Sequence, residues 1–141
     1  MRTKLVKRYW CDFCNKAGLS AGAMAKHEKH CTMNPNRECR VCKMVDSAQH
    51  PLASLIALLP VPVLHNNEWG VTEFQPGFED AVMAAIPSLR KEADNCPACI
   101  MAALRQAKIP VPIAREFNFT EEMKSIWADI NAAQAHSESC Y

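Results

Sequence analysis

The chain has 141 residues, of which 49% are hydrophobic and 22% charged, a composition typical of one globular domain or of a domain with a small attached module. No stretch approaches the roughly 18 apolar residues that a membrane-spanning helix needs. The basic N-terminal run MRTKLVKRYW is not followed by an apolar segment. We therefore expect no signal peptide and a reducing, cytoplasmic compartment (the host cytoplasm if the protein is viral).

The sign of the charge changes along the chain. Residues 1–43 contain ten Lys or Arg and three acidic residues, a net charge of +7, whereas residues 44–141 contain six basic and twelve acidic residues, a net charge of −6. This asymmetry indicates an N-terminal end that faces a polyanion and a remainder suited to protein contacts. The alternative is that the lysines simply keep a small module soluble.

The first predicted elements are a tight hairpin or knuckle over residues 9–14 and a helix over residues 20–30. Ser20 is a suitable N-cap, because its hydroxyl can accept a hydrogen bond from a free backbone N–H of the first turn. The knuckle contains Cys11 and Cys14 at CxxC spacing, and the helix carries His27. Thiolate sulfur and imidazole nitrogen are preferred zinc ligands, and a CxxC turn supplies two of the four tetrahedral donors without strain.

Two neighbouring residues compete for the fourth position of this first site. Cys31 leaves a gap of three residues after His27 and offers a thiolate, which binds zinc more strongly than an imidazole does. His30 is the alternative ligand. We prefer Cys31, in which case His30 is a surface imidazole.

This segment resembles a finger of the two-Cys two-His zinc-finger superfamily, in the variant with Cys as the last ligand, over about 25 residues from Tyr9 onward. Tyr9 stands two residues before the first Cys, and twelve residues separate Cys14 from His27. Met24 occupies the place of the family's core Leu. One position departs from the family, because its aromatic residue four after the second Cys is here Gly18. The resemblance implies a ββα finger.

The resemblance also implies which helix positions would face DNA bases, and here these are Ser20, Ala23 and Lys26. Ser and Ala discriminate little among bases, and a single finger buries too little surface for a tight specific site. A sequence-specific DNA-binding regulator is therefore an alternative that we do not favour. We expect non-specific phosphate contacts, or a protein contact through the smooth face of residues 21–25. The candidate phosphate-contacting residues are Lys4, Lys7, Arg8, Lys26 and Lys29.

The remaining elements follow in order. Asn34-Pro35-Asn36 ends the first helix and turns the chain. We predict helices over residues 52–59, 79–92 and 97–108, with Pro87 kinking or splitting the second of them. Residues 63–78 lack a clear period and are expected to form an ordered loop, and residues 109–113 are expected to be extended. A last helix begins at Thr120 and frays after Ala135. Its predicted buried stripe is Met123, Ile126, Trp127 and Ile130.

Two further CxxC pairs, Cys39/Cys42 and Cys96/Cys99, are separated by 53 residues. Together they offer four thiolates for a second zinc site, so we expect two zinc ions per chain. The pairs resemble those of four-Cys zinc ribbons and treble clefs only in that two CxxC pairs together supply the four ligands. Such a site would staple the basic module onto the rest of the chain, because zinc binding contributes directly to folding. Alternatively one pair is simply buried thiols, or Cys96/Cys99, at the start of a helix, is a redox pair.

These patterns predict a small, mainly α-helical, zinc-stabilised protein. A ββα-like basic zinc finger over residues 1–33 would be packed on or linked to a helical body over residues 34–141. We expect a non-catalytic adaptor or regulator that binds a protein partner, with non-specific nucleic-acid contact through the finger. Such brevity and a lone finger suit a phage or bacterial accessory protein. Cys140 has no partner pair and is expected to be a free surface thiol.

The enzyme alternative is a nuclease of the His-Asn-His class, which often frames its active site between two CxxC pairs. His50, His65, Asn66 and Asn67 lie between the two distant pairs of this chain. Their order does not reproduce the metal-binding pattern of that class. With only four glycines, the chain also has no phosphate-binding loop or nucleophile elbow. We therefore expect no catalytic activity.

Overall fold

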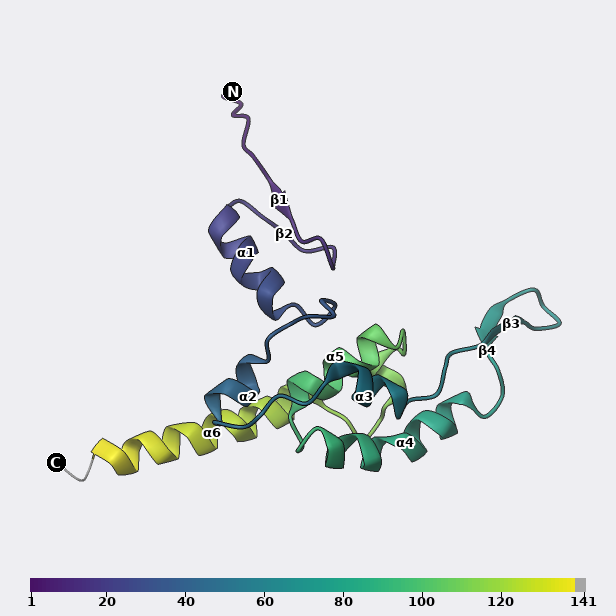
Figure 1. Cartoon of the computed structure of the whole chain (residues 1–141). Coiled ribbons are helices and arrows are strands. Elements are labelled where there is room, and N and C mark those ends of the chain that lie inside the picture. Colours follow the sequence, from purple (N-terminus) through teal and green to yellow (C-terminus); the bar gives the residue numbers. More distant parts are fainter. Residues whose placement is uncertain (139–141) are drawn as a thin grey trace.

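The computed structural model describes residues 1–138 of the chain, with side chains through residue 136. This part is mainly helical, with two small antiparallel sheets of two strands each (Figure 1). The elements in chain order are β1 (Tyr9–Trp10), β2 (Ala17–Gly18), α1 (Ala21–His30), α2 (Arg40–Met44), α3 (Leu52–Ala57), β3 (Leu64–Asn66), β4 (Thr72–Phe74), α4 (Phe78–Glu92), α5 (Pro97–Gln106), the 3-10 helix η1 (Val111–Ile113) and α6 (Phe119–Glu138). No helix in residues 1–138 combines the length and apolar character needed to cross a membrane.

The N-terminal elements form a ββα unit. Strands β1 and β2 pair antiparallel, and α1 begins where the Ser20 hydroxyl accepts a hydrogen bond from the Ala23 N–H at 3.2 Å. The predicted N-cap is therefore confirmed. A Cβ added at Gly18 would lie 3.6 Å from Met24 Cε, so the methionine fills the space beside the missing aromatic residue. The unit has a small core of its own, formed by Cys11, Met24 and Cys31.

Helix α5 lies at the centre of the second, larger core (Figure 1). Its apolar residues recur at the spacing of one helical face, and Ile100 and Leu104 are completely buried. Helix α3 contributes Leu55, which is also fully buried, and α4 contributes Val82, Ile86 and Leu89. Pro87 does not split α4, because it lies at an exposed position where water can satisfy the carbonyl that loses its helical partner.

Residues 63–78 do not form the loop that the sequence led us to expect. They contain the β3–β4 hairpin, in which Leu64 pairs with Phe74, and this hairpin projects from the body (Figure 1). The turn determines the hairpin: the Asn67 side-chain oxygen accepts the backbone N–H groups of Trp69 and Val71. Gly70 supplies the positive φ of 74° that the turn requires. Turn chemistry, and not hydrophobic alternation, specifies these strands.

Residues 109–113 are likewise not simply extended. The Ile113 N–H donates to the Pro110 carbonyl at 3.0 Å, and the Ala114 N–H donates to the Val111 carbonyl, which forms the 3-10 helix η1. The fixed φ of proline suits the start of such a turn as well as it suits an extended chain. The sequence pattern could not separate these two outcomes.

Helix α6 is less buried than predicted. It begins at Phe119, and Met123 and Ile126 pack against the main core. However, Trp127 is 47% exposed and Ile130 is only half-buried, because the helix extends beyond the body (Figure 1). The helix also continues to Glu138 without ending after Ala135. Helical periodicity identified the apolar face but not how much of it the body covers.

The ββα unit contacts the body through the segment that follows α1. The Gln106 side chain at the end of α5 donates to the carbonyls of Thr32 and Asn34, at 2.8 and 3.0 Å. The neighbouring Arg105 guanidinium donates to the Thr32 hydroxyl at 2.7 Å. The predicted break at residues 34–36 is present as a turn after α1. These contacts hold the two parts of the chain together by hydrogen bonds and not by a shared core.

Leu55→Ala should lower the free energy of unfolding by about 2–5 kcal/mol, because it removes a fully buried side chain from the main core and leaves a cavity. The matched control is Leu64→Ala, whose side chain is 58% exposed on the hairpin and should change the value by less than about 0.5 kcal/mol. Urea unfolding at constant zinc concentration measures both. Equal effects for the two variants would contradict the assignment of the core.

Candidate metal centres

The first cluster of metal-ligating side chains lies within the ββα unit. Cys11 and Cys14 from the β1–β2 turn, His27 from α1 and Cys31 just after α1 place one ligand atom each within 4.8 Å of one another. The Cys14 Sγ and His27 Nε2 atoms are 3.3 Å apart. A tetrahedral zinc site with ordinary bond lengths has a sulfur–nitrogen edge of about 3.6 Å. The cluster therefore has the right size for one ion.

Of the two candidates for the fourth ligand, the structure brings Cys31 to the cluster and leaves His30 outside it. The His30 Nδ1 donates instead to the Glu38 carbonyl at 2.9 Å. Cys31 is buried, and its backbone N–H caps α1 by donating to the Glu28 carbonyl at 3.3 Å. The His30 side chain thus helps to hold the chain segment that follows α1 against the end of that helix.

The second cluster joins the starts of two helices. Cys39 is the N-cap of α2 and Cys96 is the N-cap of α5, while Cys42 and Cys99 lie in the first turns. The Cys42 N–H donates to Cys39 Sγ at 3.4 Å. The free N–H groups and the positive end of the dipole at a helix N-terminus favour thiolate over thiol. Each CxxC pair is thus presented in a setting that suits metal ligation.

The geometry of the four sulfurs fits a metal site better than the alternatives. The Cys39–Cys96 and Cys42–Cys99 sulfur pairs are 3.5 and 3.6 Å apart, close to the edge of about 3.8 Å in a tetrahedral zinc–thiolate site. All four residues are at most 7% exposed. Redox cysteines need access to their partners, so such burial argues against a redox pair. Convergence of all four sulfurs argues against unrelated buried thiols.

In the first cluster the pKa values of Cys14 and Cys31 are shifted in opposite directions. Burial raises the pKa of Cys14, but hydrogen bonds with the Lys16 backbone and the Cys11 and Cys31 side chains outweigh it, and the pKa is lowered. Burial raises the pKa of Cys31. Burial also lowers the pKa of His27, and the nearby Lys16 charge adds to this effect, which favours the neutral imidazole that a metal site requires.

In the second cluster the pKa of one thiol is lowered and the pKa values of the other three are raised. Hydrogen bonds from Cys96 and Cys99 lower the pKa of Cys39. Burial raises the pKa of Cys42 to about 12, and the pKa values of Cys96 and Cys99 are raised by their hydrogen bonds to Cys39. Four thiolates this close repel one another, so a divalent cation at their centre is what would permit all four to ionise.

Each cluster supplies four protein donors, which completes a tetrahedral coordination shell. Catalytic zinc sites typically use three protein ligands and keep the fourth position for water or substrate. The two clusters are therefore suited to a structural role. Together they contain all seven cysteines of the described residues, and Cys140 lies outside those residues.

Of the residues of the nuclease hypothesis, His65, Asn66 and Asn67 lie together on the β3–β4 hairpin, whereas His50 precedes α3. His50 Nε2 lies 2.8 Å from an Asp94 carboxylate oxygen near the start of α3, and His65 Nε2 lies 3.3 Å from Glu73 on the projecting hairpin. Neither histidine belongs to a metal-ligand cluster within residues 1–136. Asn66 accepts a hydrogen bond from the Thr72 hydroxyl across the hairpin. His50 thus contacts the turn after α4, and His65 and Asn66 contact the opposite strand of the hairpin.

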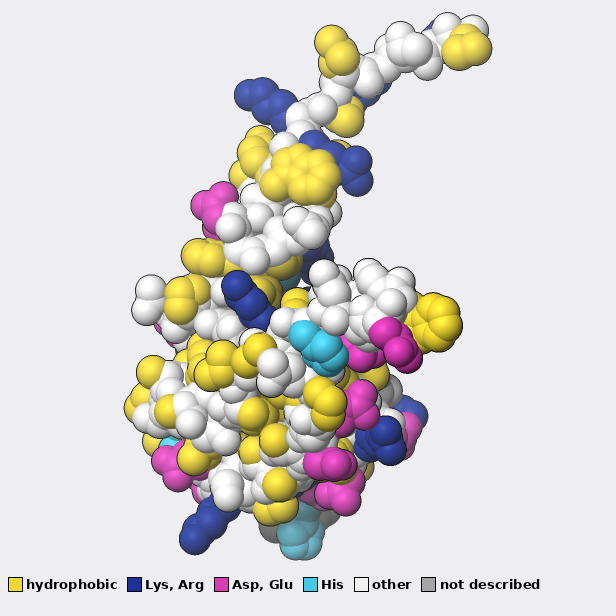
Figure 2. All heavy atoms as spheres, turned by 90° about the vertical axis from the view of Figure 1, so that its right-hand side faces the viewer, with side chains coloured by type: hydrophobic (Ala, Val, Ile, Leu, Met, Phe, Trp, Pro, Cys, Tyr) yellow, Lys and Arg dark blue, Asp and Glu magenta, His cyan; other side chains and the backbone are white. Residues whose placement is uncertain are grey.

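The basic side chains gather around the finger and the extended N-terminal segment, whereas acidic side chains lie mostly on the body below (Figure 2). Lys4, Lys7 and Arg8 lie on the exposed segment before β1, where the Arg8 guanidinium sits 5.6 Å above the Trp10 ring. Lys29 forms an ion pair with Glu38 at 3.2 Å. Its charge is therefore partly neutralised.

Lys26 belongs to a basic hollow that the sequence did not reveal. The hollow has a volume of about 320 Å³ and no carboxylate in its lining. It is lined by Lys16, Ala23, Lys26, His27, His30 and Arg40. Lys16 and Arg40 each lie close in sequence to a metal ligand, but only the fold brings Arg40, at the start of α2, to the same hollow as Lys16 and Lys26. No sequence signal for this arrangement exists.

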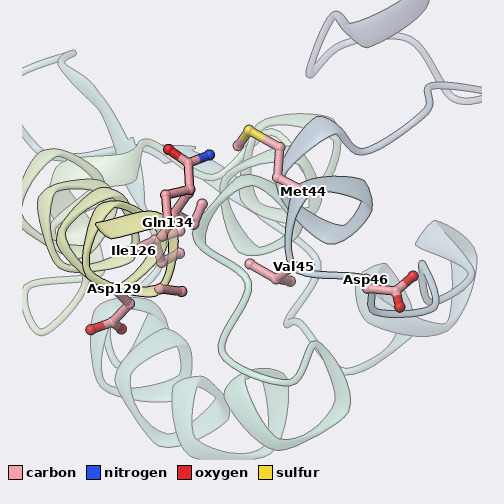
Figure 3. A pocket seen from close by; sticks show the side chains of 8 residues that line it. Met44, Val45, Asp46, Ile126, Asp129 and Gln134 are labelled. Carbon is pink, nitrogen blue, oxygen red and sulfur yellow. The ribbon is translucent and has the colours of Figure 1, made fainter. Parts of the chain in front are cut away.

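A hollow of about 880 Å³ lies between the end of α2 and α6. Met44 and Val45 face Ile126 across it, and Asp46 and Asp129 lie at opposite ends (Figure 3). Its lining contains no histidine, cysteine or lysine beside these carboxylates. An apolar groove of this kind offers contact area but no paired acid and base.

Comparison with protein-family models, curated proteins and solved structures found no significant match to this chain. The resemblance of the first cluster to a zinc finger thus rests on the residues and geometry given above.

Purified protein should contain about two zinc ions per chain, because each cluster offers one complete tetrahedral set. Cys31→Ser and Cys99→Ser should each lower the count by one, whereas His30→Ala and Cys140→Ser should leave it at two. Elemental analysis measures the count, and cobalt substitution distinguishes the site with three sulfurs from the site with four. A count of one in the wild type would remove the four-Cys site.

Proposed function

We propose that this chain is a non-catalytic, zinc-binding adaptor that acts in a reducing cytoplasm. The observation that carries the proposal is the pair of closed four-ligand clusters, one of which joins cysteines 57 positions apart. A closed site contributes folding free energy and offers no open coordination position for chemistry. The zinc ions would hold two parts of a small protein in a fixed relation.

The donor sets favour zinc over other common ions. One cluster offers three sulfurs and one nitrogen, and the other offers four sulfurs. Magnesium and calcium prefer oxygen donors, and tetrahedral sulfur and nitrogen sets are typical of structural zinc. The β1–β2–α1 arrangement around the first cluster supports a finger of the two-Cys two-His type with Cys as its last ligand.

The basic character of the finger supports contact with nucleic-acid phosphates. Lys16, Lys26 and Arg40 converge on one hollow without an acidic neighbour in its lining, and Lys4, Lys7 and Arg8 extend the positive charge along the N-terminal segment. Base recognition has less support, because the Ser20 hydroxyl is already used as a helix cap and Ala23 carries no hydrogen-bonding group. The contact would therefore be non-specific.

The other half of the proposed role is protein binding by the acidic body. Its exposed apolar side chains support this role, above all Trp69 on the hairpin, which is 82% exposed, and Trp127 on α6. The hairpin also exposes Val63, Leu64 and Val71 beside Trp69, and exposed apolar side chains that lie together mark interaction surfaces more often than single ones do.

Binding to duplex DNA should be weak, on the order of micromolar or weaker, and should fall steeply with salt, because phosphate contacts release counterions. Replacing Lys16, Lys26 and Arg40 by Ala should lower affinity for all sequences alike. It should also reduce the slope of log K against log salt by about 0.9 for each phosphate that the variant no longer neutralises. Fluorescence anisotropy with unrelated duplexes of equal length measures both quantities.

The matched control replaces three lysines of the body, Lys91, Lys108 and Lys124, which should leave the salt slope unchanged. Tight, salt-resistant binding that prefers one duplex would contradict non-specific contact and favour a sequence-specific regulator. Absence of binding at every salt concentration would favour a finger that contacts protein. In that case the face of residues 21–25 is the surface to mutate.

A further inference from the structure

Arg37 is a buried cation without a carboxylate partner. It is only 6% exposed, and no acidic side chain within residues 1–136 forms an ion pair with it. Its Nη1 lies 4.0 Å from Cys99 Sγ in the four-Cys cluster. Its Nε is buried and has no hydrogen-bond partner.

Such an arrangement is costly unless a negative charge lies nearby. Burying a guanidinium without a counter-charge is strongly unfavourable, and buried charges in proteins are normally paired. Four thiolates around one divalent cation carry a formal net charge of −2. The Cys99 sulfur that Arg37 contacts belongs to this group, so the filled cluster would supply the missing negative charge.

We propose that Arg37 is the counter-charge of the filled four-Cys site, and that this pairing couples metal binding to the docking of the finger. The inference rests on the zinc-binding function proposed above and adds a residue that is not itself a ligand. A cation held against metal-bound thiolates offsets the repulsion between their negative charges.

The backbone of Arg37 links the cluster to the finger. Its N–H donates to the Asn34 carbonyl at 3.2 Å, and the Asn34 side chain donates to the Glu28 carbonyl near the end of α1 at 2.8 Å. On the other side, the Arg37 carbonyl accepts from the Gln49 amide at 2.8 Å, and the Gln49 oxygen accepts the Cys39 N–H at 2.5 Å. One residue thus contacts both the finger segment and a proposed ligand.

The first test compares the zinc affinity of both sites in Arg37→Met and Arg37→Lys, by competition with a chromophoric chelator. Arg37→Met should weaken the four-Cys site about 10- to 100-fold, the range typical of residues that support metal ligands, and leave the finger site within about twofold. Arg37→Lys keeps the charge and should restore part of the loss. The matched control is Arg115→Met, whose side chain is 75% exposed and should change neither site.

The second test uses the wild-type protein, so it does not depend on the folding of a variant. Trypsin can cut after Arg37 only when this residue leaves the core. Cleavage there should be slow with two zinc ions bound and should rise in step with loss of zinc from the four-Cys site. Cleavage after Arg8, on the exposed N-terminal segment, should not change. Peptide mass mapping during chelator titration measures both.

The outcomes separate the two proposals. If wild-type protein binds two zinc ions but Arg37→Met leaves the four-Cys site unchanged, the proposed function stands and the role of Arg37 falls. Equal weakening of both sites would indicate a general structural role and would also overturn it, as would cleavage after Arg37 that ignores the zinc content. Wild-type protein without zinc would overturn both proposals.

Discussion

The convergence of four cysteine side chains inside the core is the contact on which the rest of this structure depends. Two pairs from distant parts of the sequence meet at the first turns of α2 and α5, and the chain between them folds as α3 and α4 against α5. Their sulfurs lie at coordination distance and away from solvent. A metal at this point would hold α2, and with it the segment leading to the finger, against the central helix of the body.

Much of the local structure could be read from the sequence, because it depends on residues close together. The CxxC spacings, the Ser20 cap and the periodic apolar face of α5 are each set within one or two turns. The β3–β4 hairpin was missed for the opposite reason: its strands show no alternation, and the Asn67 and Gly70 turn that specifies it lies among residues that read as a loop. How much of α6 is buried depends on the size of the body. The periodicity of apolar residues along the helix carries no information about that size.

The candidate site divides in the same way. The sequence identified the eight residues that form the two clusters. Zinc ligands are Cys and His side chains, and in this chain they occur in short, recognisable spacings such as CxxC. The residues that tune the clusters carry no such signal. In the sequence, nothing distinguishes Arg37 from the other basic residues of the N-terminal segment. Only the fold shows that it is buried beside Cys99. Lys16 and Arg40 line a common basic hollow only in the folded chain.

The positions of the two clusters along the chain also set the order in which they can close during synthesis. The ligands of the first span residues 11–31, so a ribosome working at roughly 5–20 residues per second makes them all within about 1–4 seconds. Cys39 then waits about 3–11 seconds for Cys96, which lies 57 positions later. The first cluster would therefore be able to take up an ion while the body is still unfolded. The thiols of Cys39 and Cys42 meanwhile stay open to oxidants and competing soft metals until α5 is made.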